Sequence, residues 1–392
     1  MTQVLEGIRV LDFGRYIAGP FCAALLGDLG ADVIRIERVG GGEDRYVSPV
    51  MADGTGAGFF QMNRNKRSLT LNPTLPEGRE IVKKLVATAD VVVANLPAPT
   101  LKAMGLDLDS LHAINPQIVL ATASAFGSEG PYSERVGFDG IGQVMSGGTY
   151  LTGQPDMPQR CLVPYVDFAT ATNCAFGTLA ALMARAKTGK GQMVEGSLLR
   201  SALTVSNTYV IEEDILALDR QRRGNRAYNA GPSDIFKTKD GWILAQVVGN
   251  NLFKRWATLV GCEDWLTDPR FKDDDSRANN GEVISEKMNE WCADYTSAEA
   301  IAILAENRIP AGEVLSPRDV LQDPQAQTML LAQDYPGLEK PAQVVGPPAQ
   351  LSDTPAVFHR RAPTEGEHTD EVLGEIGFGA AEIAELRSKQ VI

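Results

Sequence analysis

The sequence predicts an α/β protein with a parallel sheet in a large domain and a second, smaller α/β domain. The first observation is a βαβ pattern: a β-branched run over Ile8–Phe13, apolar helical spacing over Phe21–Leu29, and a second strand pattern over Asp32–Glu37. The second observation is Asp240-Gly241, a hairpin turn between two short strand patterns. We therefore expect a Rossmann-like large domain, with a ligand crevice at the carboxyl ends of its strands.

The other elements continue this pattern. Gly19-Pro20 opens the first helix and Gly30 ends it, as expected for residues with these backbone preferences. Further along we expect a helix over 78–88, strands over 90–94 and 117–123, a long helix that follows Asp167 and stops at Gly189, and mainly helical structure over 192–222. In the smaller domain we expect hairpin strands over 234–237 and 242–245, followed by two or three helices up to about 306. The rest of the chain should form extended or loop structure over 333–365 and a short helix over 380–389. The expected domains are 1–200 with 330–392 (large) and 225–325 (small), joined by linkers 201–224 and 326–345.

Composition narrows the function. The chain has 392 residues and a formal net charge of -13, which argues against a nucleic-acid partner because phosphate binding depends on clustered Lys and Arg. No apolar run approaches the ~20 residues of a membrane helix. The five cysteines are scattered without a CxxC pair, and with three histidines we expect no metal site. We expect a cytoplasmic protein.

A basic patch lies near the second strand. Arg38 and Arg45 bracket Gly40–Gly42, and Asn65-Lys66-Arg67 follows some twenty residues later. Glycines let backbone N–H groups approach phosphate oxygens, and guanidinium groups pair with them in a bidentate way, so this patch is suited to an anionic cofactor. The alternative is a solvated surface loop. Glu37 ends a strand where an acid could hold the ribose of NAD, but the preceding turn is not GxGxxG, which argues against a dinucleotide.

Asp167 stands in the first turn of the long predicted helix. It could be the helix N-cap, a role that Asp performs well. Alternatively it is a nucleophile, since the helix dipole stabilises negative charge and would keep the carboxylate ionised. The glycine-rich loop with Gly127 and Gly130 suggests close contact with a ligand or a mobile loop, and Asp139 could cap the helix that follows it.

Several segments together resemble the family III CoA-transferases, the family of the formyl-CoA, carnitine and bile-acid CoA-transferases. The resemblance covers nearly the whole chain in order. Its segments are Leu5–Phe13, Ala18–Pro20, Leu29–Glu37, Asn65–Ser68, Gly127–Pro131, Gly137–Gly147, Thr188–Gln192, Asp240–Trp242 and Gly366–Asp370.

The resemblance implies an acyl-CoA donor, a carboxylate acceptor and no metal. Asp167 would attack the thioester, and the acyl group would pass through an aspartyl anhydride and an aspartyl-CoA thioester. The residues implied to contact CoA are Arg38, Arg45, Asn65, Lys66, Arg67, Gly127 and Gly130, and those implied to line the active site are Ile17, Phe138, Gln143 and Gly231. The resemblance also implies a homodimer of interlocked chains.

The chain departs from the family pattern at three places. Ile17 replaces a Gln of formyl-CoA transferase, Asn95–Pro99 lacks the usual Arg, and Ala230–Ser233 is the nearest match to a glycine-rich active-site loop. Two alternatives stay open. An α-methylacyl-CoA racemase shares the family's fold, but the position of its acid/base His is Phe138 here, which cannot move a proton. The other alternative is a non-catalytic CoA-binding protein.

Overall fold

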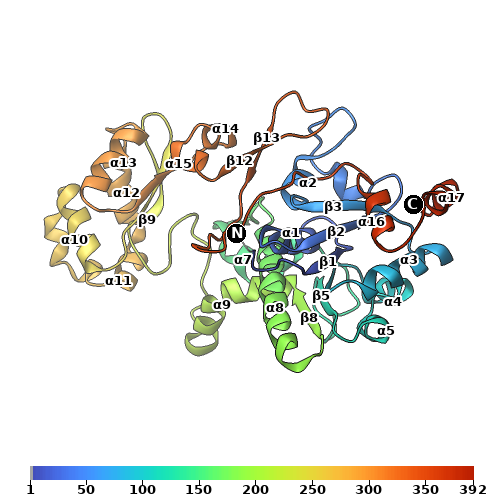
Figure 1. The fold of residues 1–392 in the computed structure, drawn as a ribbon. Coiled ribbons are helices and arrows are strands. Elements are labelled where there is room, and N and C mark those ends of the chain that lie inside the picture. The colour runs from blue at the N-terminus through green and yellow to red at the C-terminus, as the bar shows by residue number, and fades with distance from the viewer. Residues whose placement is uncertain (1–2) are drawn as a thin grey trace. The chain divides into compact units, whose positions relative to one another are not determined.

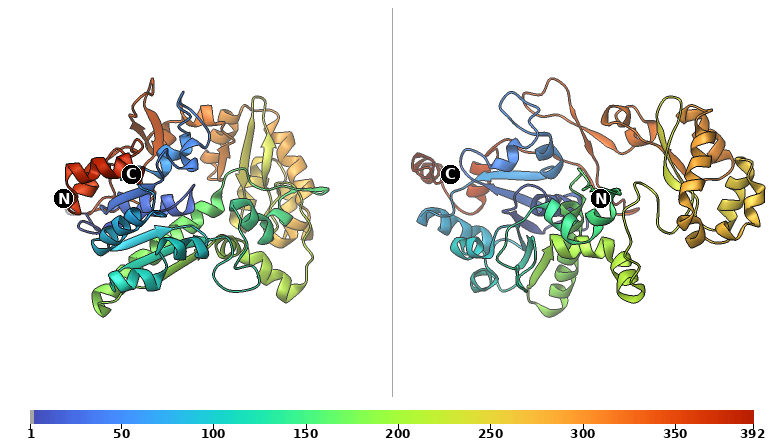
Figure 2. Two further views of the ribbon diagram at one scale, coloured as in Figure 1. Left: turned by 90° about the vertical axis from the view of Figure 1, so that its right-hand side faces the viewer. Right: turned by 180° about the vertical axis from the view of Figure 1, so that it is seen from behind.

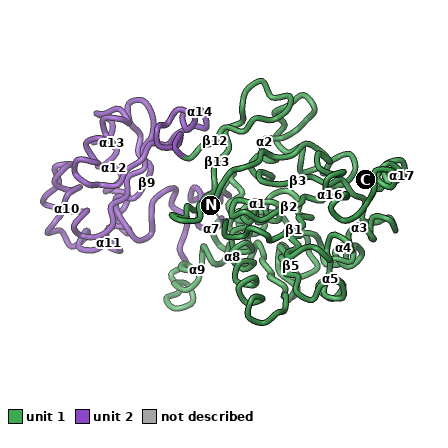
Figure 3. The backbone as a smooth tube through the Cα atoms, in the orientation of Figure 1, with its two compact units in different colours: residues 1–148, 161–218, 329–392 green, residues 149–160, 219–328 purple. Residues whose placement is uncertain are grey.

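A computed structural model describes residues 3–392, which form two compact units (Figure 3). Unit 1 contains the described residues up to Gly148 together with residues 161–218 and 329–392. Unit 2 contains residues 149–160 and 219–328. In each unit a sheet carries the helices, so the chain has the mixed α/β fold that the sequence predicts.

Unit 1 is built on a six-stranded sheet in which every neighbouring pair of strands is parallel (Figure 1). The strand order is β3-β2-β1-β4-β5-β8. The bounds are β1 Arg9–Asp12, β2 Asp32–Glu37, β3 Lys66–Thr70, β4 Val91–Ala94, β5 Val119–Ser124 and β8 Met193–Ser197. The order reverses between β1 and β4, and in open α/β sheets this is the place where the loops at the carboxyl ends diverge and leave room for a ligand.

Helices cover both faces of this sheet. Neighbouring residues of a strand point to opposite faces, so Leu11 packs into one core cluster and Val10 into another. The first cluster includes apolar residues of α3 (Pro76–Ala87), α5 (Leu108–Ile114), α16 (Thr369–Glu375) and α17 (Ala380–Ser388). The second includes those of α1 (Ala18–Asp28) and α8 (Tyr165–Thr188). Burial on both faces explains why β4 consists only of apolar residues.

The C-terminal segment packs beside the N-terminal strands of unit 1 (Figures 1 and 2). The His368 N–H donates to the Ser68 carbonyl at 2.9 Å, and Val372 and Leu373 lie in the core. The other elements of unit 1 are the 3-10 helix Glu43–Tyr46, α2 Ala57–Met62, α4 Ala98–Met104, α6 Asp139–Met145, α9 Leu198–Leu216, β12 Leu330–Gln333 and β13 Ala342–Val345. The short helix α7 (Gly148–Leu151) leads from unit 1 into unit 2.

Unit 2 confirms the predicted hairpin. β9 (Ser233–Lys237) pairs with β10 (Trp242–Gln246) in antiparallel register, and β11 (Ala311–Glu313) adds to the other side of β10. Trp256 and Phe236 are fully buried in its core. The other elements are β6 Gly153–Gln154, β7 Met157–Pro158, α10 Asn250–Leu259, the 3-10 helices Glu263–Leu266 and Pro269–Phe271, α11 Asp274–Asn279, α12 Gly281–Cys292, α13 Ser297–Glu306, α14 Pro317–Val320 and α15 Pro324–Gln327.

The units differ from the predicted domains at their boundaries. Residues 201–216, expected in a linker, belong to α9, because Ser197 caps this helix and Leu198 and Ala202 are buried in unit 1. Residues 149–160, expected in the large domain, belong to unit 2, where Gly153 pairs with Gly224. The expected linker 326–345 contains β12 and most of β13. Over residues 3–392, no helix has the length and apolar character to span a membrane.

Candidate active site

Asp167 is the third residue of α8 and lies in the first turn of this helix. Pro164 precedes the helix and makes no side-chain cap, so the interpretation of Asp167 as an N-cap is wrong. The Asp167 side chain is half-buried. Within residues 3–392, no hydrogen bond or ion pair reaches its carboxylate oxygens, whose only described neighbouring charge is Asp139. An enclosed carboxylate without partners retains its lone pairs for an incoming electrophile.

Asp139 supplies the cap that Asp167 does not. Its Oδ1 accepts the backbone N–H groups of Val166 at 2.8 Å and Asp167 at 3.0 Å. Asp139 is the first residue of α6, but it caps α8 and not the helix that it begins, so the expectation about its role was wrong. The cap satisfies two of the free N–H groups at the start of α8 and fixes the main chain of Asp167.

The electrostatics of Asp167 also differ from expectation. Burial, reinforced by the nearby negative charge of Asp139, raises the pKa of the Asp167 carboxyl from 3.8 to about 7. The helix dipole was expected to keep this group ionised, but a dipole contributes only ~0.3–1 kcal/mol and loses to desolvation and like charge. A carboxylate with a raised pKa is a stronger nucleophile when it is ionised than an ordinary surface carboxylate.

Two of the predicted lining residues lie on α6 or at its start. Gln143 is buried: its Nε2 donates to Asp139 Oδ2 at 2.5 Å and to the Cys161 carbonyl at 3.2 Å, and its Oε1 accepts the Cys161 N–H at 2.8 Å. Gln143 therefore orients Asp139 and does not face a ligand. Phe138 is 67% exposed and packs edge-on against Tyr16, with ring centroids 5.7 Å apart.

Ile17 belongs to the same neighbourhood because it precedes α1, and α1 packs along α8. Phe21 of α1 meets Phe168 of α8 at 4.9 Å between ring centroids, so the two helices begin side by side. Ile17 is partly buried against this core. The structure thus brings Ile17, Phe138 and Asp167 into one region at the beginning of α1, α6 and α8.

Sequence reasoning missed Arg15 and Asn95 in this region. The Arg15 N–H donates to Asn95 Oδ1 at 2.7 Å, and Asn95 Nδ2 donates to the Arg15 carbonyl at 2.8 Å. Gly19 makes this clamp possible, since a Cβ there would lie 2.9 Å from the Gly14 Cα and 3.0 Å from Asn95 Oδ1. Gly19 is the one local signal for such a close approach, but the partner Asn95 lies 80 residues away in the chain from Arg15.

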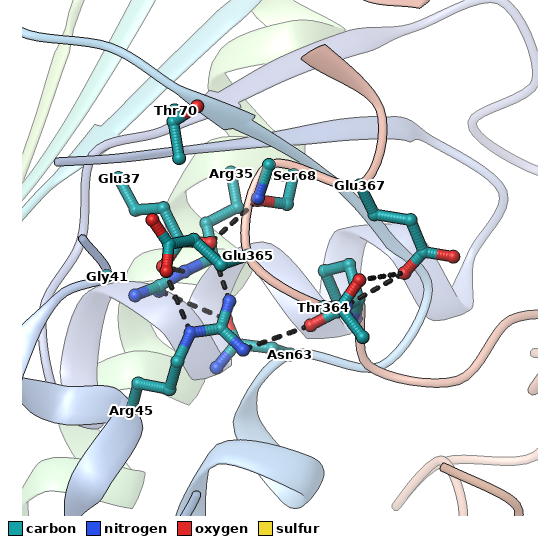
Figure 4. A network of polar contacts seen from close by, with 12 residues as sticks. Arg35, Glu37, Gly41, Arg45, Asn63, Ser68, Thr70, Thr364, Glu365 and Glu367 are labelled. Carbon is teal, nitrogen blue, oxygen red and sulfur yellow. Dashed lines mark hydrogen bonds and ion pairs between the residues drawn. The ribbon is translucent and has the colours of Figure 1, made fainter. Parts of the chain in front are cut away.

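Most of the predicted basic patch is neutralised inside unit 1. Arg45 Nη2 lies 2.6 Å from Glu37, whose other neighbours are Arg35 and Ser68 (Figure 4). Lys66 Nζ lies 2.6 Å from Asp12 and is fully buried. Buried charges in such pairs are held by their partners, and removing one partner costs about 3–5 kcal/mol. These side chains are structural in this fold and do not present free cations to a ligand.

Arg67 and Asn65 join the C-terminal segment to the sheet. Arg67 pairs with Asp32 at 2.6 Å and with Glu375 at 2.6 Å. Asn65 Nδ2 donates to Asp28 Oδ1 at 2.9 Å, and its Oδ1 accepts backbone N–H groups of the segment 359–360. The predicted CoA contacts at these two positions therefore have no free donor in this structure.

Arg38 remains as a candidate for phosphate. Its side chain is 59% exposed, its Nε donates to the Gly41 carbonyl at 2.6 Å, and the nearest carboxylate is Glu43 at 3.8 Å. Gly40 and Gly41 have positive φ values of 86° and 77°, which glycine adopts without strain. Arg38 follows β2 at the carboxyl edge of the sheet, where anionic ligands bind in open α/β folds.

The predicted glycines lie in two separate places. Gly127 follows β5 with a φ of 89°, and its N–H donates to Ser124 Oγ at 2.9 Å. Gly130 is exposed, with open space where a Cβ would be. Gly231 belongs to unit 2 and is buried against Arg277 and Ile284. Over residues 3–392, no cluster of three His, Cys, Asp or Glu side chains is arranged to hold a metal ion.

Comparisons with known proteins show the family of the chain. The family model for CoA-transferase family III matches residues 5–369. The chain is 33% identical over 395 residues to a succinyl-CoA–D-citramalate CoA-transferase of Chloroflexus aurantiacus, covering 99% of this chain and 98% of that protein. It is 34% identical over 402 residues to the beta subunit of a succinyl-CoA–L-malate CoA-transferase of the same organism, covering 100% and 98%.

Solved structures lead to the same family. A CAIB/BAIF family protein from Brucella suis superposes with a TM-score of 0.84 at 32% identity, over 96% of this chain and 100% of that chain. The family model and these relatives show that the chain is a CoA-transferase, which confirms that part of the sequence prediction. The chain belongs to family III of the CoA-transferases. Neither the racemase nor the non-catalytic alternative is favoured by these relatives.

Proposed function

We propose that the enzyme transfers CoA from an acyl-CoA donor to a free carboxylate through covalent intermediates on Asp167. The observation that supports this most strongly is the Asp167 carboxylate itself, half-buried, without hydrogen-bond partners and with its pKa raised to about 7. Such a carboxylate keeps its lone pairs for an electrophile, and it is largely ionised just above neutral pH. The proposed large domain is Rossmann-like, which the strand order β3-β2-β1-β4-β5-β8 supports.

The first half-reaction exchanges the donor acid for enzyme-bound CoA. The Asp167 carboxylate attacks the thioester carbonyl, the C–S bond breaks, and CoA leaves as a thiolate while a mixed anhydride forms. The thiolate then attacks the aspartyl carbonyl, which forms an aspartyl-CoA thioester and releases the donor's carboxylate. The second half-reaction reverses these steps with the acceptor carboxylate, which leaves as a new CoA ester and restores Asp167. Electron pairs balance at each step, and no proton has to be transferred.

The proposed substrates are CoA esters of short dicarboxylic acids. Among the relatives, names include succinyl-CoA with D-citramalate, L-malate, glutarate or mesaconate. At about 30–34% identity over nearly the full length, these enzymes support a dicarboxylate class for this chain. Arg38 and the loop with Gly127 and Gly130 are proposed to hold the CoA moiety. Cytoplasmic location is a proposal of the same kind, supported by five scattered cysteines without a CxxC pair.

A homodimer of interlocked chains completes the proposal. The helix α9 leaves a row of large apolar side chains exposed, which a monomer in water rarely does. These residues are Val205, Val210, Ile211, Ile215 and Leu216. Sedimentation analysis should give a dimer, and the double variant Ile211→Glu, Ile215→Glu should shift the mass towards the monomer. An unchanged mass distribution for that variant would remove α9 from the interface.

The experiment for the proposed reaction compares two aspartates that each lie in the first turn of a helix. Asp167→Asn should reduce steady-state transfer from succinyl-CoA to glutarate by about 10³-fold or more, because an amide cannot form the anhydride. Binding of the CoA ester should persist. Asp109→Asn, in the first turn of α5 and exposed, is the control and should leave transfer unchanged. Substantial turnover by Asp167→Asn would exclude the covalent mechanism.

A further inference from the structure

Arg15 is a cation whose backbone is fixed at the carboxyl edge of the sheet. It lies in the loop that joins β1 to α1, and Asn95, directly after β4, binds both its N–H and its carbonyl, at 2.7 and 2.8 Å. β1 and β4 are neighbours in the sheet at the point where the strand order reverses. A side chain that starts here is held in position by rigid elements, which is the requirement for a precise ligand contact.

The guanidinium of Arg15 differs from the other cations of this region. Its Nη1 is inaccessible to solvent and has no hydrogen-bond partner. No carboxylate of the described chain forms an ion pair with it, whereas Arg35 pairs with Asp44 at 2.8 Å and Lys66 with Asp12 at 2.6 Å. An unsatisfied buried donor costs about 1–3 kcal/mol, and more when it is charged. Arg35 and Lys66 are neutralised within the fold, whereas no ion pair neutralises Arg15, so its guanidinium group suits an anion from outside the chain.

The surroundings of Arg15 leave access on one side. A Cβ at Gly42 would lie 2.7 Å from Arg15 Nη1, so the guanidinium edge rests directly against a glycine backbone. The Arg15 side chain as a whole is only half-buried. Because residue 15 is only partly buried, a small anion can approach it from solvent, and the absence of a side chain at position 42 leaves room for the guanidinium group.

The residue that follows Arg15 links this loop to the segment that caps the helix of Asp167. The next residue, Tyr16, adopts a φ of 60° and packs its ring against Phe138. Phe138 adjoins Asp139, whose carboxylate holds the Asp167 N–H at 3.0 Å. A positive φ is uncommon for a residue such as tyrosine. Here the strained residue directly follows Arg15, whose backbone N–H and carbonyl are both bound by Asn95. The loop that contains Arg15 is thus connected, through Tyr16 and Phe138, to the residue that holds the main chain of Asp167.

We propose that Arg15 binds the free carboxylate at the far end of a dicarboxylic acyl group while the thioester end faces Asp167. The inference rests on the proposed function and adds the residue that selects for a second carboxylate. A monocarboxylic acyl group of the same length would fill the site and leave the Arg15 charge unpaired. Sites built to pair a polar group discriminate strongly against analogues that lack it. The other source of an anion is a phosphate of CoA, which every CoA ester carries equally.

The test compares two donors that differ only at the far end of a four-carbon acyl chain. In single-turnover measurements of the donor half-reaction, Arg15→Gln should lower kcat/KM for succinyl-CoA by about 100-fold and that for butyryl-CoA by less than about threefold. Arg15→Lys, which keeps the charge, should recover part of the loss. Arg38→Gln is the matched control, since loss of a phosphate contact should reduce both donors equally.

A binding measurement separates this inference from the covalent mechanism. The unreactive thioethers S-(3-carboxypropyl)-CoA and S-butyl-CoA differ by the same carboxylate, and calorimetry on the whole enzyme measures their affinities without any reaction at Asp167. Arg15→Gln should weaken only the carboxylated thioether, with the thermal unfolding midpoint of the free enzyme nearly unchanged. Equal weakening of both thioethers would assign Arg15 to the phosphates of CoA, and no weakening of either would exclude it from the site. Both outcomes overturn the proposal, whatever the fate of the Asp167 mechanism.

Discussion

The carboxylate of Asp139 accepts the backbone N–H of Asp167 at 3.0 Å, so one acid holds in place the main chain of another. The same contact brings a negative charge close to the Asp167 carboxyl and contributes to its raised pKa, after the larger effect of burial. Position and reactivity of the proposed nucleophile therefore have a common origin. This relationship yields two predictions that standard kinetics and unfolding measurements can check.

The first prediction concerns the pH dependence of transfer. Asp167 must be ionised to attack, and its pKa is about 7, so kcat/KM should rise with pH through a midpoint near 7. Asp139→Asn removes the negative charge and should move this midpoint to lower pH. The control Asp109→Asn should not move it. If the pH midpoint of Asp139→Asn coincided with that of the unsubstituted enzyme, the charge of Asp139 would have no effect on the ionisation of Asp167.

The second prediction concerns stability. The folded protein binds a proton at Asp167 up to about pH 7, while the unfolded chain releases it near 3.8. Between these values the free energy of unfolding falls as pH rises, and the loss is complete above pH 7. The Asp167→Asn variant has no carboxyl group to ionise in this buried position. It should therefore be more stable than the unsubstituted enzyme at pH 8, by about 1–2 kcal/mol after allowance for partial exposure.

Denaturant unfolding at two pH values measures this effect. The stability difference between Asp167→Asn and the unchanged enzyme should be large at pH 8 and should shrink towards pH 4. Asp107→Asn provides a contrast of opposite sign, because the hydrogen bonds that the Asp107 carboxylate accepts from Ser110 lower the pKa of this partly buried carboxyl. A difference for Asp167→Asn that stayed constant with pH would show that its carboxyl is not perturbed.

The third prediction concerns the clamp that holds Arg15. Gly19→Ala would place a Cβ 2.9 Å from the Gly14 Cα and 3.0 Å from Asn95 Oδ1, and neither group can move freely. Overpacking of this kind should lower the free energy of unfolding by about 1–3 kcal/mol. Gly58→Ala, in α2 with open space around the added methyl group, should be neutral or slightly stabilising. Chemical denaturation of both variants measures the difference.

The fourth prediction separates structural from ligand-binding arginines. Arg38→Gln should raise KM for CoA esters by about 3–10-fold with a smaller change in kcat, because it removes binding remote from the chemistry. Arg45→Gln removes the closer of the two ion-pair partners of buried Glu37 and should lower stability by about 3 kcal/mol. At temperatures where the Arg45→Gln enzyme is folded, its KM should stay close to normal. A raised KM for Arg45→Gln with unchanged stability would restore the CoA role that the sequence suggested.

Local patterns in the sequence predicted the fold well. The β-branched runs, the glycine at the end of α8 and the Asp240-Gly241 turn all act within a few residues, so the parallel sheet, the long helix and the hairpin could be located. The helix α9 was assigned in part to a linker because its buried side is short and its exposed side is apolar, which blurs the amphipathic pattern.

The chemistry of the site depended on contacts between distant residues. Asp139 lies 28 residues from the N–H of Asp167, and Lys66 lies 54 residues from Asp12. A string of basic residues looks the same in sequence whether its charges face a ligand or buried carboxylates, so Lys66 and Arg67 could not be told apart from Arg38. Arg15 was overlooked for the opposite reason, because its significance is the lack of a partner, which only a folded chain can reveal.

Trapping the covalent intermediate tests the central claim most directly. The enzyme is incubated with succinyl-CoA without an acceptor, treated with hydroxylamine, digested and examined by mass spectrometry. Attack of hydroxylamine on an aspartyl-CoA thioester would convert Asp167 to a hydroxamate and release CoA, so the account predicts this modification on the peptide that contains Asp167 and its absence from Asp167→Asn. An active enzyme that turns over succinyl-CoA but yields an unmodified Asp167 peptide, or a modification at another residue, would contradict the account.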